Sequence, residues 1–263
     1  MNNETFHVFK LVVSYDGTHF KGWQRGNGRT VQGVLEDALL ASMPVASKGS
    51  VPRGLDAEAL TVVGAGRTDA GVHALGQVAS VRVPSSVDPE LLFVELNRKL
   101  PEDISVRSLQ WVDDRFHARY RALAKTYRYT ILDGRVGDPF LGRFAWRVDG
   151  ELDEAAMKRA SESLIGKRDF TSLTADKSKK DKTRILHSIE ISRKASKIEI
   201  DFRGDSFLWN QVRIMAALLV ASGKHKIDAE GIGKHLAAHS RSFAPAPAPA
   251  RGLCLLSVEY DDE

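Results

Sequence analysis

The residues best placed for chemistry lie in one short glycine-rich segment, residues 64–73, with the sequence GAGRTDAGVH. Its three glycines permit tight turns and a close approach of the backbone to a ligand. Arg67 and Asp69 stand on this loop between two apolar stretches, where a rigid scaffold can present both side chains. The segment is therefore the first candidate for a functional site.

Other interpretations of this loop compete with a catalytic one. Asp69 could cap the turn through its own backbone, with Arg67 as its salt-bridge partner. Asp69 and His73 could be two metal ligands, but the same stretch offers no third carboxylate or histidine. The Gly-x-Gly at the start of the loop lacks the third glycine of a dinucleotide-binding fingerprint.

The segments around the loop have the pattern of a small α/β unit. A β-branched and aromatic strand is expected over 6–15, then a loop of glycines and polar residues over 16–29. Thr30 opens an amphipathic helix, residues 44–59 read as a loop, and strands are expected at 60–63 and 78–83. A helix over 89–99 follows, and a strand over 104–112. This order is the split βαβ or ferredoxin-like pattern.

The second half of the chain repeats this order loosely. Strands are expected at 125–132, 185–192, 197–203 and 253–260, and helices at 153–165, 207–221 and 228–239. The alternation of Ala and Pro over 244–250 predicts a stiff, extended connector. We therefore predict an α+β protein with two ferredoxin-like halves, residues 1–112 and 113–263.

Composition narrows the class of protein. The chain has 263 residues, of which 43% are apolar and 27% charged, as in ordinary globular proteins. Its longest apolar run, 214–221, is far shorter than the ~20 residues of a membrane span, and no apolar segment follows Met1. Cys254 is the only cysteine, so we expect no intrachain disulfide, no multi-cysteine metal site and a reducing, cytoplasmic location.

Positive charge is concentrated in one segment. The net charge is +4, and residues 167–184 contain seven basic and three acidic residues, an excess equal to that of the whole chain. Clustered lysine and arginine gain affinity for polyanions through counterion release, which favours a phosphate-binding arm. A solvated surface loop is the alternative.

The loop at 64–73 also carries a family resemblance. Its Gly66-Arg67-Thr68-Asp69-Ala70-Gly71-Val72-His73 resembles the catalytic motif of the TruA family of tRNA pseudouridine synthases. Other family motifs are matched, in order, by Tyr15-Asp16-Gly17 with Gly22-Trp23-Gln24, by Asp114-Arg115-Phe116-His117-Ala118-Arg119, by Lys125-Thr126-Tyr127-Arg128-Tyr129, by Ser206-Phe207-Leu208-Trp209-Asn210-Gln211-Val212-Arg213 and by Gly252-Leu253. The resemblance covers nearly the whole chain.

The resemblance implies a rearrangement of one substrate without metal, nucleotide or redox cofactor. A uridine in tRNA is detached at its N1–C1′ bond, the base turns, and C5 bonds to C1′. Asp69 corresponds to the catalytic aspartate, which either attacks C1′ or removes a proton from C2′. Arg213 is assigned to keep that carboxylate ionised. Tyr127 is assigned to stack on the uracil and to help remove the C5 proton.

The resemblance also implies contacts with RNA. The target base must leave its helix, and Arg67 resembles the family residue that fills the gap. The first glycine-rich loop offers side chains suited to phosphate contacts: Lys21, Gln24, Arg25 and Arg29. His73, His117 and Arg119 are interpreted as structural support. Tyr120 and Trp209 could be stacking platforms, but packing in the core or at its rim is the preferred interpretation.

The sequence thus predicts a tRNA pseudouridine synthase acting at positions 38, 39 and/or 40 of the anticodon arm. We expect a homodimer, with no membrane association, whose two sheets join across a central basic cleft. The alternatives are a non-catalytic tRNA clamp or chaperone, a synthase for another RNA position, and, more distantly, a metal-dependent nuclease. Residues 45–58 and the basic loop within 176–184 match no family motif, and residues 207–211 are similar to archaeal and eukaryotic members.

Overall fold

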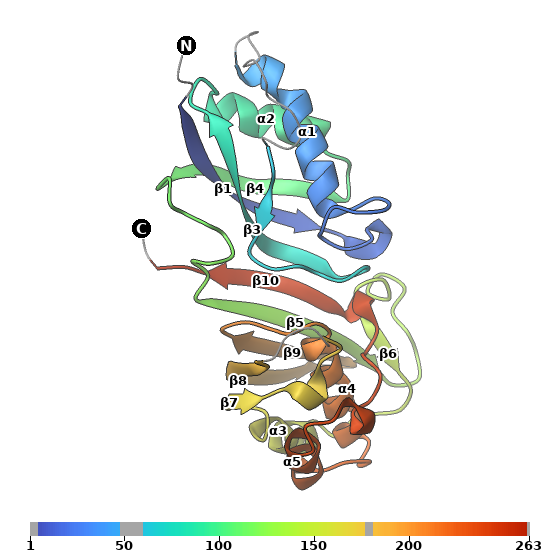
Figure 1. The fold of residues 1–263 in the computed structure, drawn as a ribbon. Helices are drawn as coiled ribbons and strands as arrows, with labels where there is room; N and C mark the ends of the chain where they lie inside the picture. The colour runs from blue at the N-terminus through green and yellow to red at the C-terminus, as the bar shows by residue number, and fades with distance from the viewer. Residues whose placement is uncertain (1–4, 48–59, 177–180, 262–263) are drawn as a thin grey trace. The chain divides into compact units, whose positions relative to one another are not determined.

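The computed structural model describes residues 5–47, 60–176 and 181–261, which form a mixed α/β protein with ten strands and five α-helices (Figure 1). The chain divides into two compact units. The first comprises residues 1–123 and 257–263, and the second comprises residues 124–256. Strand β10 (Leu253–Glu259) has residues in both units. No helix within the described ranges combines the length and the apolar character needed to cross a membrane.

The first unit is an antiparallel sheet covered by two helices. Its elements are β1 (Phe6–Tyr15), α1 (Val31–Ala46), β2 (Val63–Gly64), β3 (His73–Pro84), α2 (Pro89–Lys99) and β4 (Ile104–Val112). Strand β1 pairs with both β3 and β4, and β2 pairs with β3. Helices α1 and α2 lie side by side over this sheet (Figure 1). The fully buried residues between them include Phe9, Leu11, Leu35, Leu39, Leu92 and Leu96.

A second apolar cluster extends this unit beyond residue 112, the end of the predicted first half. Phe116 and Ala118 are buried with Val8 and Val78, and the Tyr260 ring lies 5.1 Å from the Phe116 ring. The loop after β4 therefore packs against the sheet of the first unit, together with the end of β10. Burial of this apolar surface is what assigns residues 113–123 to the first unit.

The second unit contains further antiparallel strands and three helices. Its elements are β5 (Ala124–Asp133), β6 (Trp146–Val148), α3 (Glu154–Glu162), β7 (Gly166–Asp169), β8 (Thr183–Lys194), β9 (Lys197–Gly204), α4 (Gln211–Gly223) and α5 (Ala229–Ala237). The strands are ordered β5-β9-β8-β7, all antiparallel, with β6 parallel to β5. In β9, buried and half-buried residues alternate, and α3 packs against α4 and α5 (Figure 1).

Several predicted boundaries were wrong. The expected loop at 44–59 begins later, because α1 continues to Ala46 although Pro44 has no amide hydrogen to donate within the helix. The strand expected at 60–63 is only Val63–Gly64. Helix α4 begins at Gln211 rather than 207, because Asn210 has a left-handed φ of 61°. Strands β6 and β7 were not predicted. Residues 48–58 of the unmatched insertion and 177–180 of the basic loop lie outside the described residues.

Candidate active site

Hydrogen bonds on both sides hold the loop that carries Asp69. Toward β3, the Ala65 amide donates to the Val78 carbonyl at 2.7 Å, and the Gln77 side chain donates to the Gly66 carbonyl at 2.9 Å. Toward the first glycine-rich loop, the Trp23 amide donates to the Thr68 carbonyl at 3.0 Å. The backbone on each side of Arg67 is therefore fixed before any ligand binds.

Glycines let the two loops approach more closely than other residues would allow. A Cβ atom at Gly17 would lie 2.0 Å from the Val72 carbonyl oxygen. A Cβ atom at Gly22 would lie 2.8 Å from the Thr68 carbonyl oxygen, and Gly22 also has a φ of +99°. Both are closer than real Cβ contacts, so only glycine fits. The first loop therefore forms a rigid support for the loop of Asp69.

Thr68 anchors the loop from inside. It is buried, and its hydroxyl oxygen lies 2.8 Å from the Tyr15 hydroxyl, so the two groups share a hydrogen bond. The Tyr15 ring packs edge-on against Phe20 at 6.2 Å between centroids. On either side of this buried anchor, Arg67 is exposed and Asp69 is half-buried. Anchoring of Thr68 thus presents its two neighbours at the surface of the unit.

His73 also links the two loops. Its ring is buried, and the Gly17 amide donates to its Nδ1 atom at 3.0 Å. The same Nδ1 atom lies 3.1 Å from an Asp16 carboxylate oxygen. These contacts support the structural interpretation of His73 over that of a metal ligand. Across the described residues, no group of three or more His, Cys, Asp or Glu side chains could hold a metal ion.

Two of the arginines predicted to contact phosphate have carboxylate partners. Arg25 lies 2.7 Å from a Glu36 oxygen and 3.0 Å from an Asp37 oxygen. Arg29 donates two hydrogen bonds to Asp103, each at 2.7 Å. The Arg29 guanidinium holds the pKa of Asp103 below its usual value. Both arginines therefore brace the first loop against other elements of the unit.

The remaining predicted contacts on this surface differ in their partners. Lys21 and Arg67 are exposed, and neither forms an ion pair with any described residue. Gln24 donates from its side chain to Gln32 at 2.8 Å. The cations available to a polyanion at these two loops are therefore Lys21 and Arg67.

Tyr127 lies in β5 of the second unit, as the sequence predicted. It is opposite Phe202 in β9, and only 7% of the residue is exposed. The Phe207 ring meets it edge-on, at 5.2 Å between centroids and 86° between planes. This edge-on contact holds the tyrosine ring in one orientation.

Arg213 lies in the first turn of α4 and is held by hydrogen bonds to two acceptors. Its Nε atom donates to the Ala248 carbonyl at 2.7 Å, and its Nη1 atom donates to the Asn210 side chain at 2.9 Å. Asn210 makes no side-chain cap to α4, so its side-chain oxygen is used to orient the arginine. Asn210 has a left-handed φ of 61°, a conformation that asparagine adopts more readily than most residues other than glycine.

The connector that supplies Ala248 is itself anchored. The Ala248 amide donates to the Arg213 carbonyl at 3.1 Å, and the Tyr129 hydroxyl donates to the Pro249 carbonyl at 2.8 Å. Burial raises the pKa of the Tyr129 phenol, which favours the protonated form that donates this hydrogen bond. The sequence predicts only a connector here, because a backbone acceptor leaves no side-chain signal.

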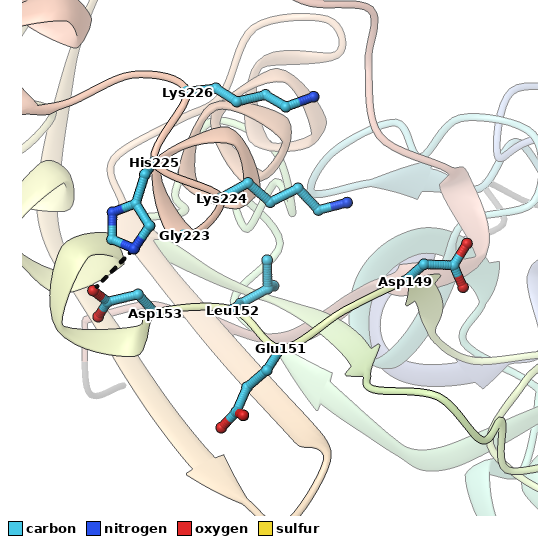
Figure 2. A pocket seen from close by; sticks show the side chains of 8 residues that line it. All are labelled: Asp149, Glu151, Leu152, Asp153, Gly223, Lys224, His225 and Lys226. Atoms are coloured by element: carbon cyan, nitrogen blue, oxygen red, sulfur yellow. Dashed lines mark ion pairs between the residues drawn. The ribbon is translucent and has the colours of Figure 1, made fainter.

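An open pocket of ≈ 700 Å³ lies elsewhere in the second unit (Figure 2). Carboxylates and cations line it together, and His225 Nε2 lies 3.5 Å from an Asp153 oxygen. The remaining charged residues of the lining are Asp149, Glu151, Lys224 and Lys226. No predicted site residue lines this pocket. Its mixed charge makes it a poor site for a polyanion.

The sequence that forms this site matches a known protein family. A model described as tRNA pseudouridine synthase matches residues 11–121 and 160–261. The chain belongs to the tRNA pseudouridine synthase family. The matched ranges of the family include Asp69 and Arg213, whereas Tyr127 lies between them.

Relatives of this family match along the full chain. A tRNA pseudouridine synthase A of Limosilactobacillus reuteri is 38% identical, covering 96% of this chain and 96% of its own length. A tRNA pseudouridine synthase A 2 of Bacillus cereus is 37% identical, covering 97% of this chain and 100% of its own. A tRNA pseudouridine synthase A of Acetivibrio thermocellus is 36% identical, covering 95% and 98%.

Proposed function

We propose that the protein is an isomerase that converts uridine to pseudouridine in the anticodon arm of tRNA, at positions 38, 39 and/or 40. The observation that carries this proposal is family membership along the whole chain, with full-length relatives named tRNA pseudouridine synthase A. The structure adds a half-buried carboxylate, Asp69, on a loop interlocked with glycines. Rigid presentation of a reactive group is what catalysis by positioning requires.

Asp69 is the proposed catalytic residue. Its carboxylate either attacks C1′ of the target nucleotide or removes a proton from C2′, and either step detaches the base at N1. The base then turns and C5 bonds to C1′; this expels the carboxylate from C1′ in the first route and is accompanied by return of the proton to C2′ in the second. The C5 proton then leaves and N1 takes up a proton. Both routes use the ionised carboxylate, which a nearby cation would favour.

Arg213 is proposed to supply that cation, and Tyr127 to stack on the uracil and assist loss of the C5 proton. Two hydrogen bonds orient the Arg213 guanidinium, which supports a positional role rather than a solvent-facing one. The edge-on contact between Tyr127 and Phe207 supports a ring of fixed orientation. The mechanism proposed needs no metal and no nucleotide cofactor.

For the RNA, we propose that Arg67 occupies the space left by the flipped base and that Lys21 contacts phosphate. Both are exposed and have no carboxylate partner among the described residues. Gln24, Arg25 and Arg29 are proposed as further contacts, with the two arginines also bracing the loop through Glu36 and Asp103.

We also propose that each of the two compact units has a ferredoxin-like topology. The strand orders β4-β1-β3-β2 and β10-β5-β9-β8 support a repeated topology. A cytoplasmic homodimer is proposed with it.

Release of tritium from C5 of uridine tests the function. Wild-type protein is incubated with C5-tritiated tRNA transcripts in which the uridines at positions 38, 39 and 40 are replaced one at a time. We expect tritium release to fall when the replaced uridine is one that the enzyme modifies. Chelator present throughout should leave release unchanged. If no tritium is released from a full set of tRNAs although the protein binds them tightly, the protein is a non-catalytic tRNA clamp and the proposed enzymatic function is wrong.

A further inference from the structure

We propose that Tyr120, supported by His117, is a stacking platform for an unpaired base of the tRNA, separate from the target uridine. The proposal rests on the proposed function, since it takes tRNA as the ligand. Tyr120 is 78% exposed, so packing in the core or at its rim does not account for a tyrosine at this position. An isolated exposed tyrosine would need no explanation, but this one lies in an ordered setting.

The turn that carries Tyr120 is pinned by alternate residues. Phe116 and Ala118 are buried in the first unit. The Ala118 amide donates to the Ser80 hydroxyl at 3.2 Å, and the Tyr260 hydroxyl donates to the Ala118 carbonyl at 2.7 Å. Because these anchors fix the backbone at 116 and 118, the side chains between and after them are held at the surface.

His117 orders the tyrosine ring itself. Its Nδ1 atom accepts from the amides of Arg119 at 3.2 Å and Tyr120 at 3.3 Å, which fixes the imidazole against the turn. The imidazole and phenol rings stack at 4.2 Å between centroids and 30° between planes. One face of the phenol is thus covered by His117, and the opposite face is open. A pre-ordered ring loses little conformational entropy when a base stacks on it.

The surroundings of the ring carry the charge that RNA requires. Arg115 and Arg119 are exposed, and neither forms an ion pair with any described residue. The Asp113 carboxylate accepts from the Arg115 amide at 2.8 Å, so it is engaged in the turn. An exposed aromatic face beside unpaired guanidinium groups is the combination that binds single-stranded nucleotides.

The test compares Tyr120→Leu and Tyr120→Phe with the wild type. We expect the leucine variant to raise the Kd for tRNA about tenfold and the phenylalanine variant to leave it near the wild-type value, because a base stacks on the ring rather than on the hydroxyl. At subsaturating tRNA, tritium release should fall in the leucine variant in step with its weaker binding. Phe140→Ala is the matched control, since Phe140 is 88% exposed on a different loop, and its Kd should not change.

Salt dependence separates stacking from charge. Arg119→Gln should reduce the slope of log Kd against log salt concentration by roughly one, whereas Tyr120→Leu should weaken binding equally at every salt concentration. If wild type and Tyr120→Leu bind tRNA with equal affinity, or if that variant changes its oligomeric state, the proposal that a base stacks on Tyr120 is wrong. Absence of tritium release by the wild type would instead defeat the proposed function.

Discussion

At the scale of single residues, the groups that position the site are as informative as the groups proposed to react. Thr68 and Gly22 fix the backbone beside Asp69, and Asn210 orients Arg213. The motif around Asp69 could be predicted from sequence, because residue types and spacing carry it. The acceptor at Ala248 could not, since it is a backbone carbonyl 35 residues from Arg213.

Substitution of Gly22 by alanine tests the interlocked loops. The φ of +99° and the 2.8 Å approach to the Thr68 carbonyl predict a loss of about 1–3 kcal/mol in the free energy of unfolding. Tritium release should fall roughly tenfold, because the loop of Asp69 shifts. Urea denaturation and single-turnover release measure the two effects. Gly233→Ala in α5 is the control, expected to gain about 0.5–1 kcal/mol with unchanged release. Unchanged release in Gly22→Ala would contradict the positional role.

The pair of Arg29 and Asp103 predicts a pH dependence of stability. Because the folded pKa of Asp103 is lowered, its contribution is present above the unfolded value of about 3.9 and is lost as pH falls through the folded value. Asp103→Asn should therefore be less stable than wild type at pH 7 by roughly 1 kcal/mol. That difference should shrink as pH falls below about 4. Urea midpoints of both proteins across pH 2–7 measure it, and a constant difference would exclude this linkage.

At the scale of elements, the sequence predicted helix starts well. Thr30, Asp88, Asp153 and Asp228 each accept a hydrogen bond from an amide in the first turn of a helix, which is the signal that a cap residue provides. Helix α4 is the exception, because the residue at its start serves Arg213 instead. The capping rule fails at α4 because the Asn210 side chain bonds to Arg213 and not to an amide of the first turn.

Short strands could not be predicted for a different reason. Strand β7 has four residues, of the sequence GKRD, and pairs with β8 from Gly166 opposite Leu186. No local propensity favours a strand there. Its extended form depends on hydrogen bonds to a partner distant in sequence, which single-sequence patterns do not register.

Asn210→Gly separates helix formation from function in α4. Glycine adopts a φ of 61° without strain, so the free energy of unfolding should be unchanged or slightly higher. Loss of the acceptor for Arg213 should lower tritium release roughly tenfold at saturating tRNA. Ala195→Gly, at a φ of 53° between β8 and β9, is the matched control and should retain full release. Full activity in Asn210→Gly would remove the orienting role.

At the scale of the whole molecule, the order of elements was predictable and the division into units was less so. Periodicity gave the alternation of strands and helices in both halves. The packing of Phe116 and Tyr260 into the first unit depends on contacts across 144 residues of sequence, and β10 has residues in both units. Burial that depends on residues so far apart in sequence arises only in the folded sheet, so local sequence patterns cannot predict it.

The proposed homodimer gives a prediction at this scale. Sedimentation equilibrium at micromolar concentration should return about twice the chain mass of 29.0 kDa. Tyr120→Leu should give the same mass, because its ring is proposed to face RNA. A mass near 29.0 kDa across the concentration range would contradict the dimer and leave the proposed reaction untouched.

The most direct test of the central claim is single-turnover release of C5 tritium, with enzyme saturating over tRNA, by wild type and Asp69→Asn. The substitution keeps size and removes the ionisable carboxylate, and removal of a negative charge should maintain or strengthen tRNA binding. Asp149→Asn, at a carboxylate whose side chain is 93% exposed and away from the proposed site residues, is the control. We predict release by wild type and Asp149→Asn, and none by Asp69→Asn despite full binding. Release by Asp69→Asn at the wild-type rate would show that another group performs the reaction.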